Sequence, residues 1–132
     1  MKFDHVGVAV KSVDQMLAIY RQMGEFQVRQ TEVAGQKAKV ALLKAGDTSV
    51  EFLEPTSEDS TLAKFIRERG EGLHHIAFEV DDIEKTTEEL RRRGFRFIYD
   101  KAADGKFGSR VNFMHPKSTG GILVELTQSA PE

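Results

Sequence analysis

The order of apolar and polar positions predicts a strand, a helix and three more strands in the first half of the chain. Between residues 3 and 10, larger apolar side chains alternate with small or polar ones, as in a strand with one covered face. Ser12-Val13-Asp14-Gln15 has the form of a capping box, and apolar residues then recur at helical spacing up to Gly24, a predicted C′ residue. The three further strands are predicted at residues 26–31, 37–45 and 48–54.

The same order of elements returns in the second half, which indicates a duplicated unit. Residues 73–85 repeat the pattern of residues 3–15 at an offset of 70, which aligns His5 with His75. A repeat this long that occurs only twice is typical of a pseudo-symmetric domain and not of a solenoid. The elements predicted in the second half are a strand at 73–80, a helix at 82–93 and strands near 95–99, 109–115 and 121–127.

Together these elements predict an α+β fold in a single domain, residues 1–132. The domain would consist of two βαβββ repeats at about 1–56 and 72–128, linked by a helix at about 60–69. We expect the tandem modules to form a curved mixed sheet around a shared metal-binding cleft.

Four polar residues interrupt apolar strands at equivalent places in the two halves. His5 and His75 stand on the first strands, and a mid-strand glutamate follows on each last strand, Glu51 and Glu125. Neighbouring strand residues point to opposite faces, so His74 is predicted to point away from the face of His75. A carboxylate in a half-buried strand is costly unless it is paired. Each residue alone is typical of a structural position, but the four together predict a site for a divalent metal ion with open positions.

Composition narrows the kind of site. The chain contains no cysteine, which excludes disulfides, thiolate nucleophiles and thiolate ligands, so a metal would be held by nitrogen and oxygen. The formal net charge of -2 gives no broad basic field, and we expect no binding to nucleic acid or to a membrane. The N-terminus lacks the apolar core of a signal peptide and no apolar run has the length of a membrane span, so a cytoplasmic protein is expected.

The chain resembles the vicinal oxygen chelate superfamily, which groups glyoxalases, bleomycin-resistance proteins and extradiol dioxygenases. The resemblance covers essentially the whole chain and is carried by DHVGVAV (4–10), VEFLEP (50–55), GLHHIAFEVDDI (72–83) and FMHPKSTGGILVELTQ (113–128). The last run is the most specific, because His-Pro-Lys-x-x-Gly-Gly before a final strand is a feature of methylmalonyl-CoA epimerases. The resemblance implies a glyoxalase-like fold. It also implies interconversion of (2R)- and (2S)-methylmalonyl-CoA by proton abstraction next to the thioester, with a metal ion stabilising the enolate.

The resemblance also implies roles for the four polar residues. The metal ligands of the family fall on His5, Glu51, His75 and Glu125. Cobalt is the expected ion, with zinc, nickel or manganese as alternatives. Glu125 is expected to be the base on one face of the reacting carbon, and Glu51 the base on the other.

The CoA-thioester substrate is expected to bind at residues outside the metal site. The candidates are Gln36, His115, Lys117 and Ser118. His115 and Lys117 also fit an ordinary strand end and a solvated loop. Gly35 departs from the family, because a glutamate assigned as a base in some epimerases commonly lies there, and the second base is therefore open. The family resemblance also implies a homodimer.

Other members of the superfamily provide the alternative functions. A lactoylglutathione lyase of the glyoxalase I type would use a similar metal site, but the His-Pro-Lys run argues against it. A metal-free ligand-sequestering protein of the bleomycin-resistance type would need none of the four ligands, so bound metal separates it from an epimerase. A dioxygenase would place two histidines and one carboxylate on iron, in chains that are commonly longer.

Overall fold

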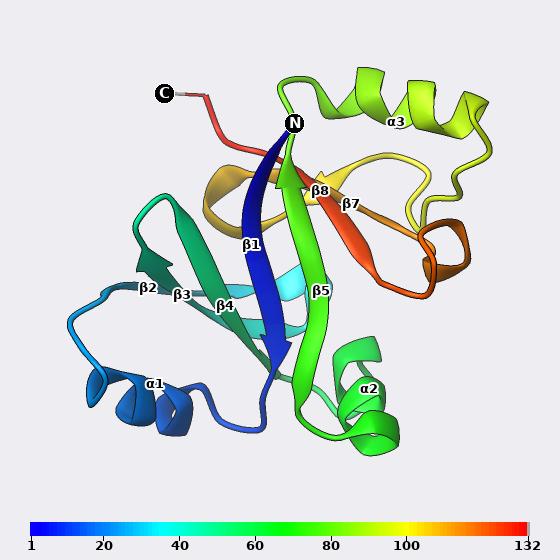
Figure 1. The fold of residues 1–132 in the computed structure, drawn as a ribbon. Coiled ribbons are helices and arrows are strands. Elements are labelled where there is room, and N and C mark those ends of the chain that lie inside the picture. The colour runs from blue at the N-terminus through cyan, green and yellow to red at the C-terminus, as the bar shows by residue number, and fades with distance from the viewer. Residues whose placement is uncertain (132) are drawn as a thin grey trace. The chain divides into compact units, whose positions relative to one another are not determined.

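The computed structural model describes residues 1–131, and it consists of helices packed on mixed strands (Figure 1). The strands are β1 (Lys2–Ala9), β2 (Gln27–Val33), β3 (Ala38–Ala45), β4 (Thr48–Pro55), β5 (Gly72–Glu79), β6 (Ala103–Asp104), β7 (Arg110–Met114) and β8 (Val124–Gln128). The helices are α1 (Val13–Arg21), α2 (Thr61–Arg69) and α3 (Ile83–Arg92), with short 3-10 turns η1 (Ala34–Gln36), η2 (Lys106–Gly108) and η3 (Pro116–Ser118). The predicted α+β class is confirmed. In this part of the chain, no helix has both the length and the hydrophobicity needed to cross a bilayer.

The chain divides into two compact units, and the boundaries between them fall inside strands. One unit is His5–His74, and the other combines Met1–Asp4 with the chain from His75 onward. Hydrogen-bonded neighbours follow the order β2-β3-β4-β1 in the first half and β5-β8-β7-β6 in the second. Each unit therefore includes the first residues of a strand whose remainder belongs to the other unit.

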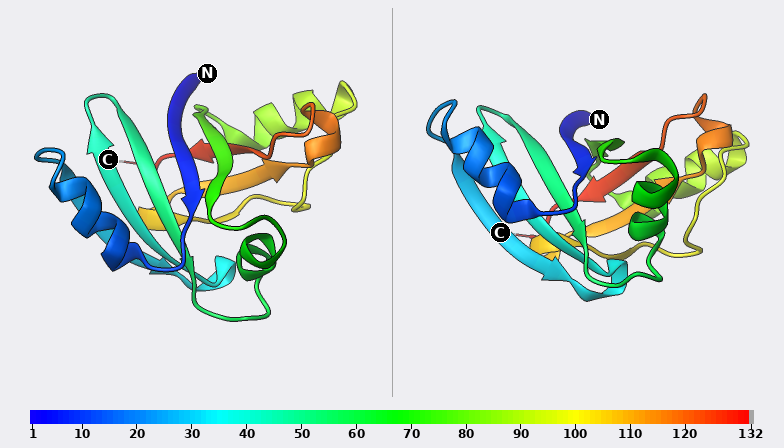
Figure 2. Two further views of the ribbon diagram at one scale, coloured as in Figure 1. Left: turned by 60° about the horizontal axis from the view of Figure 1, so that its bottom comes forward. Right: turned by 90° about the horizontal axis from the view of Figure 1, so that it is seen from below.

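In the His5–His74 unit, α1 and α2 pack on opposite faces of the same strands (Figure 2). Strand β3 pairs antiparallel with β2 and β4, and β4 runs parallel to β1. Leu43 and Phe52 pack with Leu17 of α1 on one face. Leu53 packs with Leu62 of α2 on the other. Strand β4 is therefore covered on both sides, which buries the side chains at its centre.

A side chain from the end of a strand caps the start of both α1 and α3. Glu54 of β4 accepts a hydrogen bond from the N–H of Val13 at 2.8 Å. Gln128 of β8 accepts one from the N–H of Ile83, also at 2.8 Å. Each capping residue lies three positions after one of the candidate glutamates. The strand that carries each glutamate therefore also fixes the start of the helix in its repeat.

Helix α1 begins where the sequence predicts but ends earlier. The side chain of Ser12 accepts a hydrogen bond from the N–H of Gln15 at 3.2 Å, as expected for an N-cap. The helix ends at Arg21 with Gln22 as its C-cap residue in a right-handed conformation, so Gly24 is not the C′ residue. The prediction for Gly24 was wrong because the chain closes the helix without a left-handed residue.

The strand predicted at 95–99 is replaced by an irregular segment with a single bridge between Phe97 and Met114. Asn112 explains the difference. Its Oδ1 accepts a hydrogen bond from the N–H of Tyr99 at 3.1 Å, and its Nδ2 donates to the Tyr99 carbonyl at 3.0 Å. The Asn112 side chain thus binds the N–H and the carbonyl of Tyr99, which in a regular strand would pair with the backbone of a neighbouring strand.

Gly105 precedes η2 at a point where the backbone has no room for a side chain. A Cβ atom there would lie 2.6 Å from Ser109 Oγ and 2.7 Å from Val111 Cγ1. The N–H of Gly105 also donates to the Ser109 carbonyl at 2.8 Å. This close approach closes the loop between β6 and β7.

We expect Gly105→Ala to lower the free energy of unfolding by about 1–3 kcal/mol, because its methyl group would collide with Val111. Gly35→Ala is the matched control, since nothing lies within 4 Å of a Cβ at Gly35, and it should leave the stability nearly unchanged. Urea unfolding of both variants measures the difference. Equal destabilisation by the two substitutions would contradict the prediction.

Candidate metal centre

Strands β1 and β4 bring an imidazole and a carboxylate together in the His5–His74 unit. Glu51 lies opposite Gly7 in the parallel pairing of the two strands. His5 precedes Gly7 by two residues and shares its face, and its Nε2 lies 3.4 Å from Glu51 Oε2. His5 is 0% exposed and Glu51 5%. Because Gly7 has no side chain, the space opposite Glu51 stays open for the imidazole.

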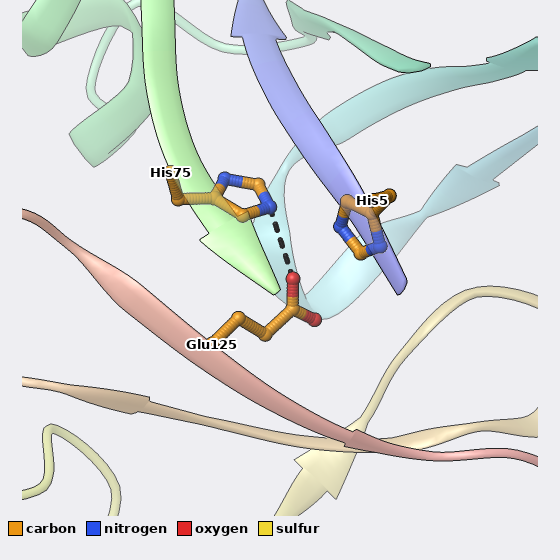
Figure 3. A group of neighbouring side chains, drawn as sticks. All are labelled: His5, His75 and Glu125. Atoms are coloured by element: carbon orange, nitrogen blue, oxygen red, sulfur yellow. Dashed lines mark ion pairs between the residues drawn. The ribbon is translucent and has the colours of Figure 1, made fainter. Parts of the chain in front are cut away.

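Strands β5 and β8 repeat this arrangement in the other unit. Glu125 lies opposite Ala77, and His75 precedes Ala77 by two residues. The Nε2 of His75 lies 2.9 Å from Glu125 Oε1, and Figure 3 shows the imidazole directed at the carboxylate. Both residues are 4% exposed. A small residue opposite a glutamate, with a histidine two positions earlier, is therefore the common plan of the two halves.

The chemistry of these side chains fits a bound cation. A buried carboxylate costs several kcal/mol unless a positive charge or hydrogen-bond donors compensate it. His5, His75 and Glu125 are buried, and each offers one ligand atom suited to a metal ion. Imidazole nitrogen with carboxylate oxygen is a donor set for zinc and similar divalent ions. The predicted ligands thus form two buried pairs, His5 with Glu51 and His75 with Glu125.

The two neighbouring histidines have different surroundings. His75 is buried and contacts Glu125. His74 is half-buried, and its ring packs edge to face against Phe65 of α2, with 4.8 Å between the ring centroids. The alternation of side chains along β5 therefore gives each histidine its own environment.

Two aromatic rings lie beside the His75–Glu125 pair, and neither was predicted from the sequence as a site residue. Phe113 stands opposite Glu125 in the pairing of β7 and β8, and its ring meets His75 edge to face at 5.6 Å. Tyr99 packs on Phe113 at 6.2 Å. Burial, and then the negative charge of Glu125, raises the pKa of Tyr99. No periodicity marks Tyr99 in the sequence, because its segment is not a regular strand.

Three of the four predicted substrate residues lie in or next to η3, where two of their side chains stabilise the turn. His115 accepts a hydrogen bond from the N–H of Lys117 through its Nδ1 at 3.2 Å. Ser118 accepts one from the N–H of Arg96 through its Oγ at 2.9 Å. The side chain of Lys117 is exposed. The fourth residue, Gln36, is half-buried at the end of η1 in the other unit.

Known proteins similar to this chain share its full length. A mouse mitochondrial methylmalonyl-CoA epimerase is 33% identical over 130 residues, which cover 97% of this chain and 73% of the mouse protein. The structure of a variant of the Streptomyces coelicolor methylmalonyl-CoA epimerase in complex with 2-nitronate-propionyl-CoA is 36% identical, covers 99% of each chain and superposes with a TM-score of 0.95.

A second solved structure, a methylmalonyl-CoA epimerase in complex with methylmalonyl-CoA and NH4+, is 37% identical. It covers 98% of this chain and 94% of its own, with a TM-score of 0.93. These similarities confirm the predicted glyoxalase-like fold. Residues 4–113 also match the sequence model of a protein family. The chain therefore belongs to the Glyoxalase/Bleomycin resistance protein/Dioxygenase superfamily.

Proposed function

We propose that this chain is a methylmalonyl-CoA epimerase, which interconverts the (2R) and (2S) forms of its substrate. The observation that carries the proposal is the full-length similarity to epimerases in a chain that buries a histidine–glutamate pair in each half. Methylmalonyl-CoA is the ligand named for one of the similar structures. A carboxylated CoA thioester is therefore the substrate class that we assign.

In this proposal, the ligands of one divalent metal ion are His5, Glu51, His75 and Glu125. Cobalt is our first candidate, and zinc, nickel or manganese are alternatives, because all accept imidazole and carboxylate ligands. Such an ion, when bound, supplies Lewis acidity that stabilises negative charge on the thioester oxygen.

Epimerisation requires a base on each face of the carbon next to the thioester. Glu125 is our candidate for one face. Its Oε1 faces His75 Nε2 at 2.9 Å, so we assign the proton transfer to Oε2. Glu51 is our candidate for the other face, because Gly35 offers no carboxylate where some epimerases have a base. Burial of both carboxylates keeps water from competing for the proton.

We assign substrate binding outside the metal centre to Gln36, His115, Lys117 and Ser118. The exposed side chain of Lys117 is suited to a carboxylate or to a CoA phosphate. The hydrogen bonds of His115 and Ser118 fix the turn that presents it. A homodimer and a cytoplasmic location, both expected above, stay predictions.

Incubation of the purified protein with methylmalonyl-CoA in D₂O should place one deuterium at C2, because removal and return of the proton exchange it with solvent. Mass spectrometry measures the exchange, and removal of metal with a chelator should abolish it. Glutathione hemithioacetal is the control substrate for a lactoylglutathione lyase. Turnover of the hemithioacetal without deuterium exchange into methylmalonyl-CoA would refute the proposal.

Glu125→Gln should lower kcat by about 100-fold or more, because an amide does not accept the C2 proton. Glu79→Gln is the matched control, since Glu79 lies on β5 and binds Ser129 at 2.8 Å, and it should keep full activity. The rate of C2 exchange in D₂O is the measurement. Equal rates for Glu125→Gln and the wild-type protein would remove Glu125 as the base.

His75→Ala should lose bound metal, because it removes a buried ligand nitrogen. His74→Ala should keep the metal and lose some stability, since it removes a ring packed on Phe65. Metal content by mass spectrometry and thermal unfolding separate the two effects. Loss of metal from both variants to the same extent would show that the neighbouring histidines share one role.

A further inference from the structure

The backbone of Tyr99 is fixed by three hydrogen bonds from side chains. Asn112, which is 0% exposed, binds both the N–H and the carbonyl of Tyr99. Arg91 donates to the same carbonyl at 3.0 Å. Such bonds to an irregular segment remove the backbone freedom that would let the side chain change position.

The ring of Tyr99 belongs to a row of edge-to-face contacts that leads to the metal centre. Phe113 lies between Tyr99 and His75, at 6.2 Å from the first ring and 5.6 Å from the second. Phe113 is also the residue opposite Glu125 on the neighbouring strand. Tyr99 therefore lies on the face of the sheet that carries both His75 and Glu125.

The hydroxyl group of Tyr99 is a donor that the described residues, 1–131, leave without a hydrogen bond. The residue is half-buried and not enclosed on all sides. A tyrosine hydroxyl keeps its proton near neutral pH, because its ordinary pKa is about 10. A neutral hydrogen-bond donor therefore lies on the face of the sheet that carries Glu125, the carboxylate to which we assign the base role.

The reaction itself brings a substrate carboxylate to this place. A base that removes the C2 proton must come within about 3 Å of the C2 carbon atom. The carboxylate of the substrate is bonded to C2, so it must lie close to Glu125. Two carboxylates at such a distance repel each other, and a neutral donor nearby offsets part of that repulsion.

Resting on the proposed function, we propose that Tyr99 is a substrate-binding residue whose hydroxyl group donates a hydrogen bond to the carboxylate on C2 of the CoA thioester. The packing on Phe113 and the bonds from Asn112 place this donor. Tyr99 thereby selects thioesters that carry a carboxylate at C2 over those that carry none.

Calorimetric binding of malonyl-CoA and acetyl-CoA to Tyr99→Phe tests this role, because the two ligands differ only in that carboxylate. The variant keeps the ring on Phe113 and removes the hydroxyl alone. We expect affinity for malonyl-CoA to fall about 10- to 100-fold, the usual effect of a lost hydrogen bond to a charged group. Affinity for acetyl-CoA, metal content and thermal stability should stay unchanged. Tyr20→Phe is the matched control, since Tyr20 packs edge to face on Phe52, and it should change neither affinity.

Three results would overturn the assignment. Malonyl-CoA affinity of Tyr99→Phe within twofold of the wild-type value shows that the hydroxyl does not contact the ligand. An equal loss for both ligands shows that it contacts another part of the thioester. A wild-type protein that binds neither ligand and shows no exchange at C2 refutes the proposed function together with the role of Tyr99, whereas the first two results leave the proposed function intact.

Discussion

The structure depends on the burial of a carboxylate against an imidazole, once in each half of the chain. Removing a carboxylate from water costs several kcal/mol, and this cost must be met by a cation or by donors placed to within a fraction of an ångström. Strand pairing supplies that precision. The parallel register of β1 with β4 and of β5 with β8 sets each glutamate opposite a small residue, and the histidine two positions earlier then faces it.

The two halves share this register and differ in what surrounds it. Glu54 and Gln128 accept hydrogen bonds from the first residues of α1 and α3, so both helices are held to equivalent strands in the same way. The residue opposite the glutamate on the far side is Leu42 in the first half and Phe113 in the second. At this position the second half has an aromatic ring and the first half has an aliphatic side chain. The surroundings of Glu125 and Glu51 therefore differ.

The side chains of the two buried histidine–glutamate pairs could be selected from the sequence because strand alternation and the 70-residue offset are both visible in it. His5 and His75 each begin a period-2 strand, and parity alone separates His75 from His74. Tyr99 could not be found in this way. Its backbone is bound by the side chain of Asn112, which lies 13 positions later, and no local pattern encodes a contact of that kind. The early end of α1 was missed for a different reason, since the N–H of Gln22 closes the helix by local bonds to Ile19 and Tyr20 that need no glycine.

The unit boundaries inside β1 and β5 bear on whether either repeat could fold by itself. The unit that contains the second repeat includes Met1–Asp4, and within it Phe3 packs on Phe78 at 5.9 Å. The other unit includes His74, which packs on Phe65. A cut between the repeats would therefore leave each piece without part of its own packing.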